Sequence, residues 1–351
     1  MPGGIEGAVM KKSIFAVLLV LSMSFVCLFA AGTREGVPVD WSGFTAEAAP
    51  PAEVRVIALK GPTAMGMVEL MNESEAGPVD GNDYAFTIAA AIDEVTPKIV
   101  RGDVDIAAVP ANLASVLYNN TKGGVKVLAI NTLGVLYIVE SGDTVASVSD
   151  LRGKTIYASG KGATPEYALN YILSQSGIDP RKDVTIEWKS EHAECVAALA
   201  ATPNGIAMLP QPFVTTAMVK NPKIRIALDM TQLWDDLQKR SATQSTLVTG
   251  VVVGRTSFIE EHPQAVASFL EQYAQSVAFV QRNIPEAAVL IEKYDIIPAA
   301  VATKALPYCN IVCLTGAELQ AKLSGYLAVL FDQNPKSVGG ALPLDDFYFS
   351  H

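Results

Sequence analysis

Short apolar runs rich in Val and Ile alternate along most of this 351-residue chain with longer segments whose apolar residues recur at helical spacing. Runs such as Val54–Leu59 are typical of strands buried on both faces, and the longer segments are typical of the helices that cover them. The expected strands are Val54–Leu59, Tyr84–Ala89, Val104–Val109, Val125–Asn131, Gly134–Val139, Lys154–Tyr157, Val184–Trp188, Gly205–Leu209, Ile224–Asp229 and Thr249–Val253. The expected helices include Ala111–Asn119, Phe213–Lys220, Thr231–Lys239, Pro263–Arg282, Pro285–Tyr294, Pro298–Leu306 and Gly316–Phe331. The pattern predicts an α/β fold with mainly parallel sheets flanked by helices.

The most informative segment is Asp150–Leu173, with the sequence DLRGKTIYASGKGATPEYALNYIL. It predicts a strand at Lys154–Tyr157, a Gly-rich turn and an amphipathic helix with Thr164 as its N-cap and Pro165 as its first residue. Such a turn directs backbone N–H groups and the positive end of a helix dipole at one point, which suits a small polar or anionic ligand. The spacing matches neither Gly-rich nucleotide-binding motif. An ordinary connection between a strand and a helix is the alternative interpretation.

The N-terminus carries the pattern of an export signal. A basic start at Met10–Lys12 precedes the apolar run Ser13–Ala31, so residues 1–31 are interpreted as the signal, with Met10 as the true start. The run is about as long as a membrane span, and an uncleaved anchor is the competing interpretation. Cys27 is a candidate lipid attachment site. Residues 32–52 are rich in Gly, Pro and Ala and predict a flexible tether. The protein is therefore expected outside the cytoplasmic membrane, either periplasmic or membrane-tethered.

Composition narrows the class of partner. The net charge is −10, which argues against nucleic acid or an anionic membrane surface. It does not fix the charge of a small ligand, because a local site can oppose the charge of the whole protein. A monomer that binds a small molecule is the expectation.

The chain offers little metal or redox chemistry. Cys195, Cys309 and Cys313 follow the signal, but no second Cys pair or His cluster accompanies them, so neither a disulfide framework nor a zinc site is predicted. Whether any two of them form a disulfide stays open. His192 with Glu191 or Glu194 could supply an acid/base pair. No nucleophile or metal constellation joins that cluster, so we expect no catalytic site, no metal and no cofactor.

Polar residues follow five of the expected strands at the point where each strand ends. Open α/β sheets bind ligands beyond the carboxyl ends of their strands, so these loops are candidate ligand contacts. Asn112, Asn131 and Gln211 carry neutral amides, which orient a ligand rather than act as acids or bases. Asn112 or Thr164 could instead serve only as a helix cap. The five loops are 61–66, 110–112, 131–132, 159–164 and 210–213.

Taken together, these segments resemble the type II periplasmic solute-binding proteins of ABC transporters. The resemblance rests on the order and spacing of GPTAMGMVELM, DIAAVPANLASVLYN, AINTLGVLYIV, SVSDLRGKTIYASGKGATPEYALNYIL, GIAMLPQPFVTTAM and FIEEHPQAVASFLEQYAQSV. The group concerned includes the binders of aliphatic sulfonates, taurine and thiamine-pyrimidine precursors. The resemblance implies ligand capture between two lobes and delivery to an ABC permease and its ATPase.

The resemblance also implies a domain organisation. Residues 53–139 together with 250–351 are expected to form the first lobe, and residues 140–249 the second. The two crossings of the hinge map to about Val139–Ser147 and Ser245–Thr249.

The resemblance transfers a set of pocket residues, loop by loop. In the first lobe they are Gly61, Pro62, Thr63, Met65, Pro110, Asn112, Asn131 and Thr132. In the second lobe they are Ser159, Lys161, Gly162, Ala163, Thr164, Gln211 and Pro212. Sulfonate binders would be expected to place an Arg in the cleft, and Lys161 is the only basic candidate in these loops. The class of ligand therefore stays open.

Two other functions use the same fold. One is an enzyme that acts on a small biosynthetic metabolite, and the other is a receptor module that senses a ligand without a permease. The export signal disfavours a cytosolic enzyme. Turnover of a candidate ligand would separate an enzyme from a binder.

Overall fold

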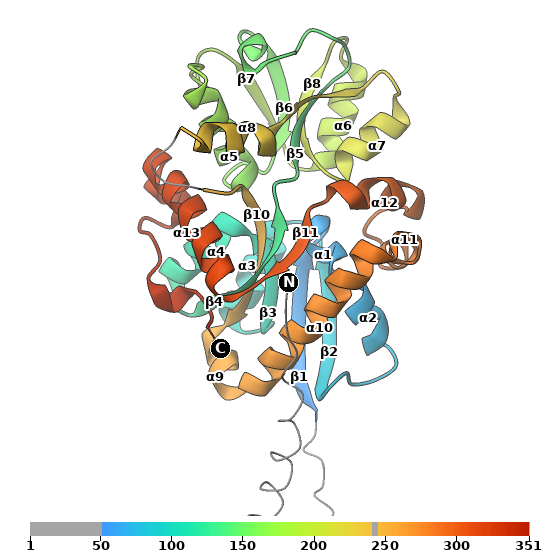
Figure 1. Cartoon of the computed structure of the whole chain (residues 1–351), viewed down its shortest axis with the longest axis vertical. Helices are drawn as coiled ribbons and strands as arrows, with labels where there is room; N and C mark the ends of the chain where they lie inside the picture. Colours follow the sequence, from blue (N-terminus) through green and yellow to red (C-terminus); the bar gives the residue numbers. More distant parts are fainter. Residues whose placement is uncertain (1–50, 241–244, 351) are drawn as a thin grey trace, which may run out of the picture. The chain divides into compact units, whose positions relative to one another are not determined.

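The structure is a computed structural model that describes residues 51–240 and 245–350 (Figure 1). The predicted export signal, Cys27 and nearly all of the predicted tether lie outside the described residues. The strands are β1 (Ala52–Leu59), β2 (Asn82–Ala89), β3 (Ile106–Pro110), β4 (Val125–Leu133), β5 (Leu136–Glu140), β6 (Thr155–Ser159), β7 (Thr185–Lys189), β8 (Ile206–Pro210), β9 (Arg225–Asp229), β10 (Val248–Arg255) and β11 (Ile311–Leu314).

Helices follow most of these strands. They are α1 (Pro62–Met65), α2 (Val68–Ser74), α3 (Ile92–Arg101), α4 (Ala111–Thr121), α5 (Thr164–Gln175), α6 (His192–Ala201), α7 (Phe213–Lys220), α8 (Met230–Gln238), α9 (Thr256–Glu261), α10 (Pro263–Arg282), α11 (Ile284–Lys293), α12 (Ala299–Ala305) and α13 (Gly316–Gln333). Single turns of 3-10 helix are η2 (Val148–Leu151), η3 (Leu306–Tyr308), η4 (Pro335–Val338) and η5 (Asp345–Phe347).

The first sheet has six strands in the order β11-β4-β10-β3-β1-β2. β1 pairs in parallel with β2 and β3, whereas β10 runs antiparallel between β3 and β4. The alternation of strands and helices thus produces the parallel part of the sheet, and a strand from late in the chain completes its centre. The apolar run of β1 is buried on both faces, as a covered parallel sheet requires.

The second sheet has five strands in the order β7-β6-β8-β5-β9. β6 pairs in parallel with β7 and β8, and β5 runs antiparallel to β8 and β9. All five strands come from the continuous stretch 136–229.

The chain passes between the two sheets twice. The first passage lies between Leu133, the last residue of β4, and Leu136, the first residue of β5 (Figure 1). This is earlier than the expected crossing at Val139–Ser147, because the segment that continues the β4 run already pairs with β8 and β9. The second passage leads from α8 to β10, and part of it lies outside the described residues.

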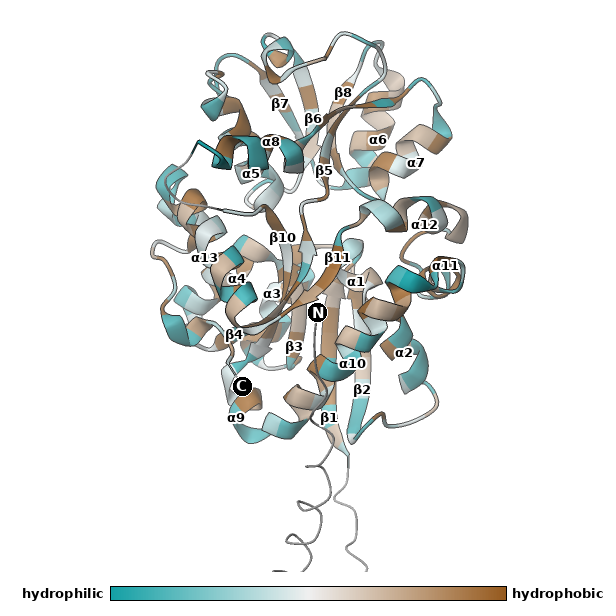
Figure 2. Ribbon diagram, in the orientation of Figure 1, coloured by the Kyte–Doolittle hydropathy of each residue, from teal (hydrophilic) through white to brown (hydrophobic). Residues whose placement is uncertain are grey.

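Apolar residues fill the interior, and polar ones cover the outer faces of the helices (Figure 2). One buried cluster includes strand residues of both sheets, such as Val127 and Ile138. Aromatic rings help to join them, since Trp234 of α8 lies 4.6 Å from Tyr171 of α5 and 5.5 Å from Tyr326 of α13, centroid to centroid. The apolar core is therefore continuous from one sheet to the other.

A buried carboxylate ties three strands of the first sheet together before β3 begins. Asp105 accepts hydrogen bonds from the Arg55 backbone N–H at 3.0 Å and from the Arg55 guanidinium at 2.7 and 2.8 Å. Arg255, the last residue of β10, donates to the same carboxylate at 2.8 Å. Burial alone would raise the pKa of Asp105, but these hydrogen bonds outweigh it and lower the pKa below its ordinary value.

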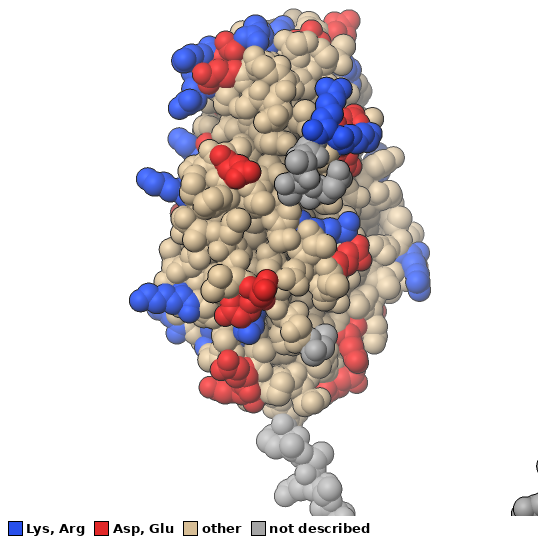
Figure 3. Space-filling view, turned by 60° about the vertical axis from the view of Figure 1, so that its left-hand side comes forward, with Lys and Arg blue, Asp and Glu red and all other residues tan. Residues whose placement is uncertain are grey.

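Elsewhere the two signs of charge are mixed. On the face shown in Figure 3, Lys and Arg side chains are interspersed with Asp and Glu. Within residues 51–240 and 245–350, no helix is both long and apolar enough to cross a lipid bilayer.

Candidate functional site

The candidate loops lie at the carboxyl ends of β1, β3 and β4 in the first sheet and of β6 and β8 in the second. A direct contact joins the two groups, since Asn112 Nδ2 in the first turn of α4 donates to the Gly162 carbonyl at 3.2 Å. The same amide donates to the Ser337 carbonyl at 3.1 Å. The Thr164 hydroxyl donates to Asn112 Oδ1 at 3.5 Å. Asn112 therefore bonds the second sheet's Gly-rich turn and is not merely a helix cap.

Asn131 lies at the end of β4 and is completely buried. Its Oδ1 accepts a hydrogen bond from the Thr132 hydroxyl at 3.0 Å, whereas its Nδ2 has no hydrogen-bond partner among the described residues. Gly250 of β10 lies against it, because a Cβ at Gly250 would meet Asn131 Oδ1 at 2.4 Å and Thr63 Cγ2 at 2.7 Å. The structure thus brings Thr63, Asn131 and Thr132 together around Gly250.

The turn 159–164 links β6 to α5. Gly160 and Gly162 have φ values of 80° and 79°, a left-handed conformation that favours glycine. The N-cap of α5 is Ala163 and not Thr164 as predicted, because the Thr164 side chain is buried towards Asn112 instead of folding back on its own helix. The Glu166 carboxylate accepts a hydrogen bond at the start of the helix instead, from the Gly162 N–H at 2.6 Å. Lys161 is exposed.

Ser159, the last residue of β6, has a partner that the sequence did not predict. Its hydroxyl lies 2.5 Å from Nδ1 of His192, and the His192 ring packs against Phe213 with centroids 4.8 Å apart. Burial lowers the pKa of His192 to about 4, so the ring is neutral at neutral pH. Of the two carboxylates that could have paired with it, Glu194 accepts from the Ser190 N–H at 3.0 Å, and Glu191 is exposed.

Three of the predicted ligand contacts do not simply line a binding site. Met65 is completely buried among the apolar residues that pack under α1 and α2. Gln211 Oε1 accepts from the Thr215 hydroxyl at 2.9 Å within its own helix start, while the Gln211 N–H donates to the Val135 carbonyl at the first passage. Pro212 is buried beside it. Gly61, Pro62 and Ala163 lie at the starts of α1 and α5, and Pro110 at the start of α4.

Further buried polar atoms without partners lie near the two passages. Within the described residues they include the hydroxyls of Thr231, Ser245 and Thr249. Thr231 packs on the first passage so closely that a Cβ at Gly134 would lie 2.1 Å from its Oγ1. Thr231 and Gly250 were not among the predicted site residues. An isolated glycine in the β-branched run TGVVVG was the available signal for a close approach at Gly250.

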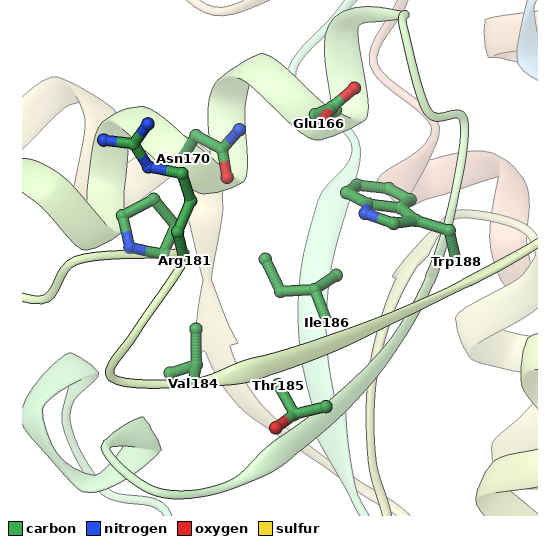
Figure 4. Close-up of a pocket in the computed structure, with 8 residues that line it drawn as sticks. Glu166, Asn170, Arg181, Val184, Thr185, Ile186 and Trp188 are labelled. Atoms are coloured by element: carbon green, nitrogen blue, oxygen red, sulfur yellow. The ribbon is translucent and has the colours of Figure 1, made fainter.

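Two hollows lie outside the predicted set of residues. One of about 440 Å³ lies between α5 and the edge strand β7 of the second sheet, where Glu166 and Asn170 face Ile186 and Trp188 (Figure 4). The other, of about 280 Å³, lies beside η3 and β11 and includes Gln281 and Asn310. Neither is lined by a predicted ligand residue.

The described part of the chain contains no group of three or more His, Cys, Asp or Glu residues placed to hold a metal ion. Cys195, Cys309 and Cys313 are free thiols. The polar side chains gathered at these strand ends are neutral amides and hydroxyls, the neutral imidazole of His192 and the exposed Lys161, and the amides and hydroxyls can orient a ligand by hydrogen bonds.

Comparisons with known proteins concern the family and the fold. A family model described as an ABC transporter, phosphonate, periplasmic substrate-binding protein matches residues 71–303. No curated protein matches the chain.

Several solved structures share the fold. An ABC transporter protein from Parabacteroides distasonis is 22% identical, with a TM-score of 0.69 over 85% of this chain and 99% of its own. The aliphatic sulphonate binding protein SsuA from Escherichia coli is 17% identical, with a TM-score of 0.68 over 86% and 92%. The alkanesulfonate-binding protein SsuA from Xanthomonas axonopodis pv. citri, bound to MOPS, is 17% identical, with a TM-score of 0.65 over 85% and 96%. These similarities confirm the predicted two-lobe α/β fold.

Proposed function

Because the chain belongs to the family of periplasmic substrate-binding proteins of phosphonate ABC transporters, we propose that it captures a small organic molecule where its two sheets meet. The chain is the extracytoplasmic substrate-binding component of an ABC importer, as the resemblance in its sequence predicted. Its partners are a small-molecule ligand and a membrane permease. We also propose which residues bind the ligand.

One observation carries the proposed site. Asn131 Nδ2 is completely buried and lacks a hydrogen-bond partner within the described residues. A buried polar group left unpaired costs about 1–3 kcal/mol, so such a group in a folded protein calls for a partner. A ligand acceptor at Asn131 supplies one, with Thr132 and Thr63 beside it.

We define the first lobe as the first sheet with its helices and the second lobe as the second sheet with its helices. The two passages, at 134–135 and between α8 and β10, then serve as the hinge of a closing motion. The Asn112–Gly162 hydrogen bond spans the lobes, so it forms on closure and breaks on opening. With this definition the second boundary between the lobes stays near residue 250, as predicted, and the first boundary moves to the end of β4.

The remaining predictions concern the whole protein. We propose that residues 1–31 direct export, that residues 32–52 act as a tether, and that the protein works as a monomer. Lipid attachment at Cys27 is the alternative to a signal that ends at Ala31. A binding role without catalysis is favoured because Ser159 and His192 are not joined by a carboxylate that would orient the imidazole, among the residues described.

The decisive test replaces Asn131 with Ala. Native mass spectrometry of the purified protein, followed by a thermal-shift screen of sulfonates, phosphonates, pyrimidines, flavins and amines, identifies a ligand by the rise in apparent stability. With that ligand, Asn131→Ala is expected to weaken binding about tenfold to a hundredfold, measured by isothermal titration calorimetry.

Asn119→Ala is the matched control. This amide lies at the other end of α4 and donates to the carbonyls of Val338 and Ala341, both at 2.7 Å, outside the site. The control is expected to alter stability and leave ligand affinity unchanged. Wild-type affinity in a folded Asn131→Ala protein contradicts the proposed site.

A further inference from the structure

We propose that Tyr326 limits the affinity of the site by opposing closure of the lobes in the absence of ligand. Its hydroxyl and the neighbouring indole N–H of Trp234 are buried, without hydrogen-bond partners among the described residues, where the lobes meet. Both groups gain water when the lobes separate. This inference rests on the proposed function, because it concerns the closing motion of the same two lobes.

Tyr326 belongs to the first lobe but inserts into the second. It lies in α13, which packs on α4 and on the strands β4 and β10 of the first sheet (Figure 1). Its ring lies 5.5 Å from that of Trp234 in α8, and Trp234 lies 4.6 Å from Tyr171 of α5, centroid to centroid. Burial raises the pKa of the Tyr326 hydroxyl, and Thr164 and Tyr167 of α5 are near enough to modify that rise. The hydroxyl therefore lies among helices of the second lobe.

The two polar groups are buried there at a cost. Tyr326 and Trp234 are completely buried, and within residues 51–240 and 245–350 neither the hydroxyl nor the indole N–H has a hydrogen-bond partner. The hydroxyl of Tyr171, whose ring packs on Trp234, accepts a hydrogen bond from Gln238 Nε2 at 2.9 Å. A polar group that is buried unpaired loses the hydrogen bonds that it makes with water. Closing the lobes over these two groups is therefore opposed by their loss of hydration.

The same junction separates in the proposed motion. Thr164 at the start of α5 donates to Asn112 Oδ1 at 3.5 Å, and Asn112 Nδ2 donates to the Gly162 carbonyl at 3.2 Å. The hydrogen bond that opening breaks thus lies beside the segment of α5 that faces Tyr326. Moving α13 away from α5 and α8 exposes both polar groups to water. The ligand must offset their desolvation when the lobes close, so its apparent affinity falls with the fraction of molecules that are closed.

Tyr326→Phe removes the hydroxyl and keeps the ring that packs on Trp234. The ratio of open to closed molecules without ligand is expected to fall about tenfold. Tyr273→Phe is the matched control. Its hydroxyl is also completely buried and unpartnered in the described part of the chain, but its ring stacks on Phe269 inside the first lobe, where opening does not expose it. Both variants are expected to fold, because neither removes a hydrogen bond between described residues.

Acrylamide quenching of Trp234 fluorescence measures the opening without any ligand, because Trp234 is completely buried in the closed arrangement. The chain has three tryptophans, so Trp41→Phe and Trp188→Phe leave Trp234 as the only one. In this background Tyr326→Phe is expected to lower the quenching constant. Tyr273→Phe is expected to leave it unchanged.

Asn112→Ala provides the opposite change, since it removes the hydrogen bond to Gly162 and is expected to raise the quenching constant. Adding Tyr326→Phe to Asn112→Ala should lower the constant again. If Tyr326→Phe leaves the constant unchanged both alone and in the Asn112→Ala protein, the inference is overturned. An equal fall in Tyr273→Phe overturns it as well. The proposed function fails independently, when Asn131→Ala leaves the affinity for the identified ligand unchanged.

Discussion

Single residues at the carboxyl ends of the strands set the geometry of the site, and Gly250 is the clearest case. It lies opposite Pro110 on β3 and Thr132 on β4, where any side chain would collide with Asn131 and Thr63. The absence of a Cβ at this position leaves room for the Asn131 carboxamide. Gly250 therefore belongs to the site although it offers no hydrogen bond from a side chain.

Gly250→Ala tests this at the residue scale. A methyl 2.4 Å from Asn131 Oδ1 forces that side chain to move, so we expect a loss of about 1–3 kcal/mol in the free energy of unfolding and a clear loss of ligand affinity. Urea denaturation and calorimetry measure the two effects.

Gly254→Ala in the same strand is the comparison. Its added Cβ would meet the terminal carbons of Leu128 and Ile259 at 3.1 and 3.2 Å, which can shift slightly. Normal ligand binding in Gly250→Ala, or an equal loss of binding in Gly254→Ala, would contradict the assignment.

At the scale of elements, Asp105 shows how strands far apart in sequence are fastened. It joins β1 to the start of β3 through Arg55 and to β10 through Arg255. Because its pKa in the folded protein is lowered, its contribution to stability is present above its pKa in the unfolded chain, about 3.9, and is lost as pH falls through the folded value.

Asp105→Asn is expected to reduce the free energy of unfolding at pH 7 by about 3 kcal/mol, because two partly exposed guanidinium groups lose their common partner. The difference from the wild-type protein should begin to narrow as pH falls below about 3.9, where this carboxyl becomes protonated in the unfolded chain, and it should close as pH falls through the lowered pKa of the folded carboxyl. Urea titrations at several pH values measure this. Asp103→Asn is the control: it removes an exposed carboxylate that pairs with Arg101, so the free energy of unfolding should change little. If the difference between Asp105→Asn and the wild-type protein does not depend on pH, the proposed cause is wrong.

The elements also show what the sequence could and could not predict. Helix Pro263–Arg282 was predicted with the bounds that the structure has, because Pro opens it and a long apolar stripe continues through it. The four-residue strand β11 was missed, since so short a run carries no period of its own. Sheet membership was mistaken at β5, because pairing with β8 depends on residues some 70 positions later in the chain.

The same limit applies to the site. The candidate loops could be predicted because the ends of the strands can be recognised in the sequence. Asn131 and Asn112 could be selected within those loops because their side chains carry amides. The direction of a side chain depends on packing that the sequence does not display. Met65 therefore turned out to be a core residue, and the Gln211 side chain bonds its own helix start.

For the molecule as a whole, the proposed motion depends on contacts that span the lobes. Asn112→Ala removes the hydrogen bond to Gly162, so we expect a larger population of separated lobes without ligand. Small-angle X-ray scattering should show a larger radius of gyration for this variant, and saturating ligand should bring it back towards the wild-type value.

Ser115→Ala provides the control for this motion. The Ser115 hydroxyl donates to the Val338 carbonyl at 2.8 Å, so it fastens the same helix to the same segment as Asn112 but does not reach the second lobe. Its radius of gyration should match that of the wild-type protein. Equal scattering from all three ligand-free proteins would count against closure through Asn112.

The central place of β10 in the first sheet has a consequence for how the protein is made. Ribosomes produce the chain from its N-terminus, so every strand of the second sheet, 136–229, is available before Val248–Arg255 appears. Until then β3 and β4 lack the strand that lies between them, and their backbone edges stay open. The second sheet should thus be completed first during biogenesis, and the half-made first sheet is the part of the nascent chain that most needs protection from aggregation.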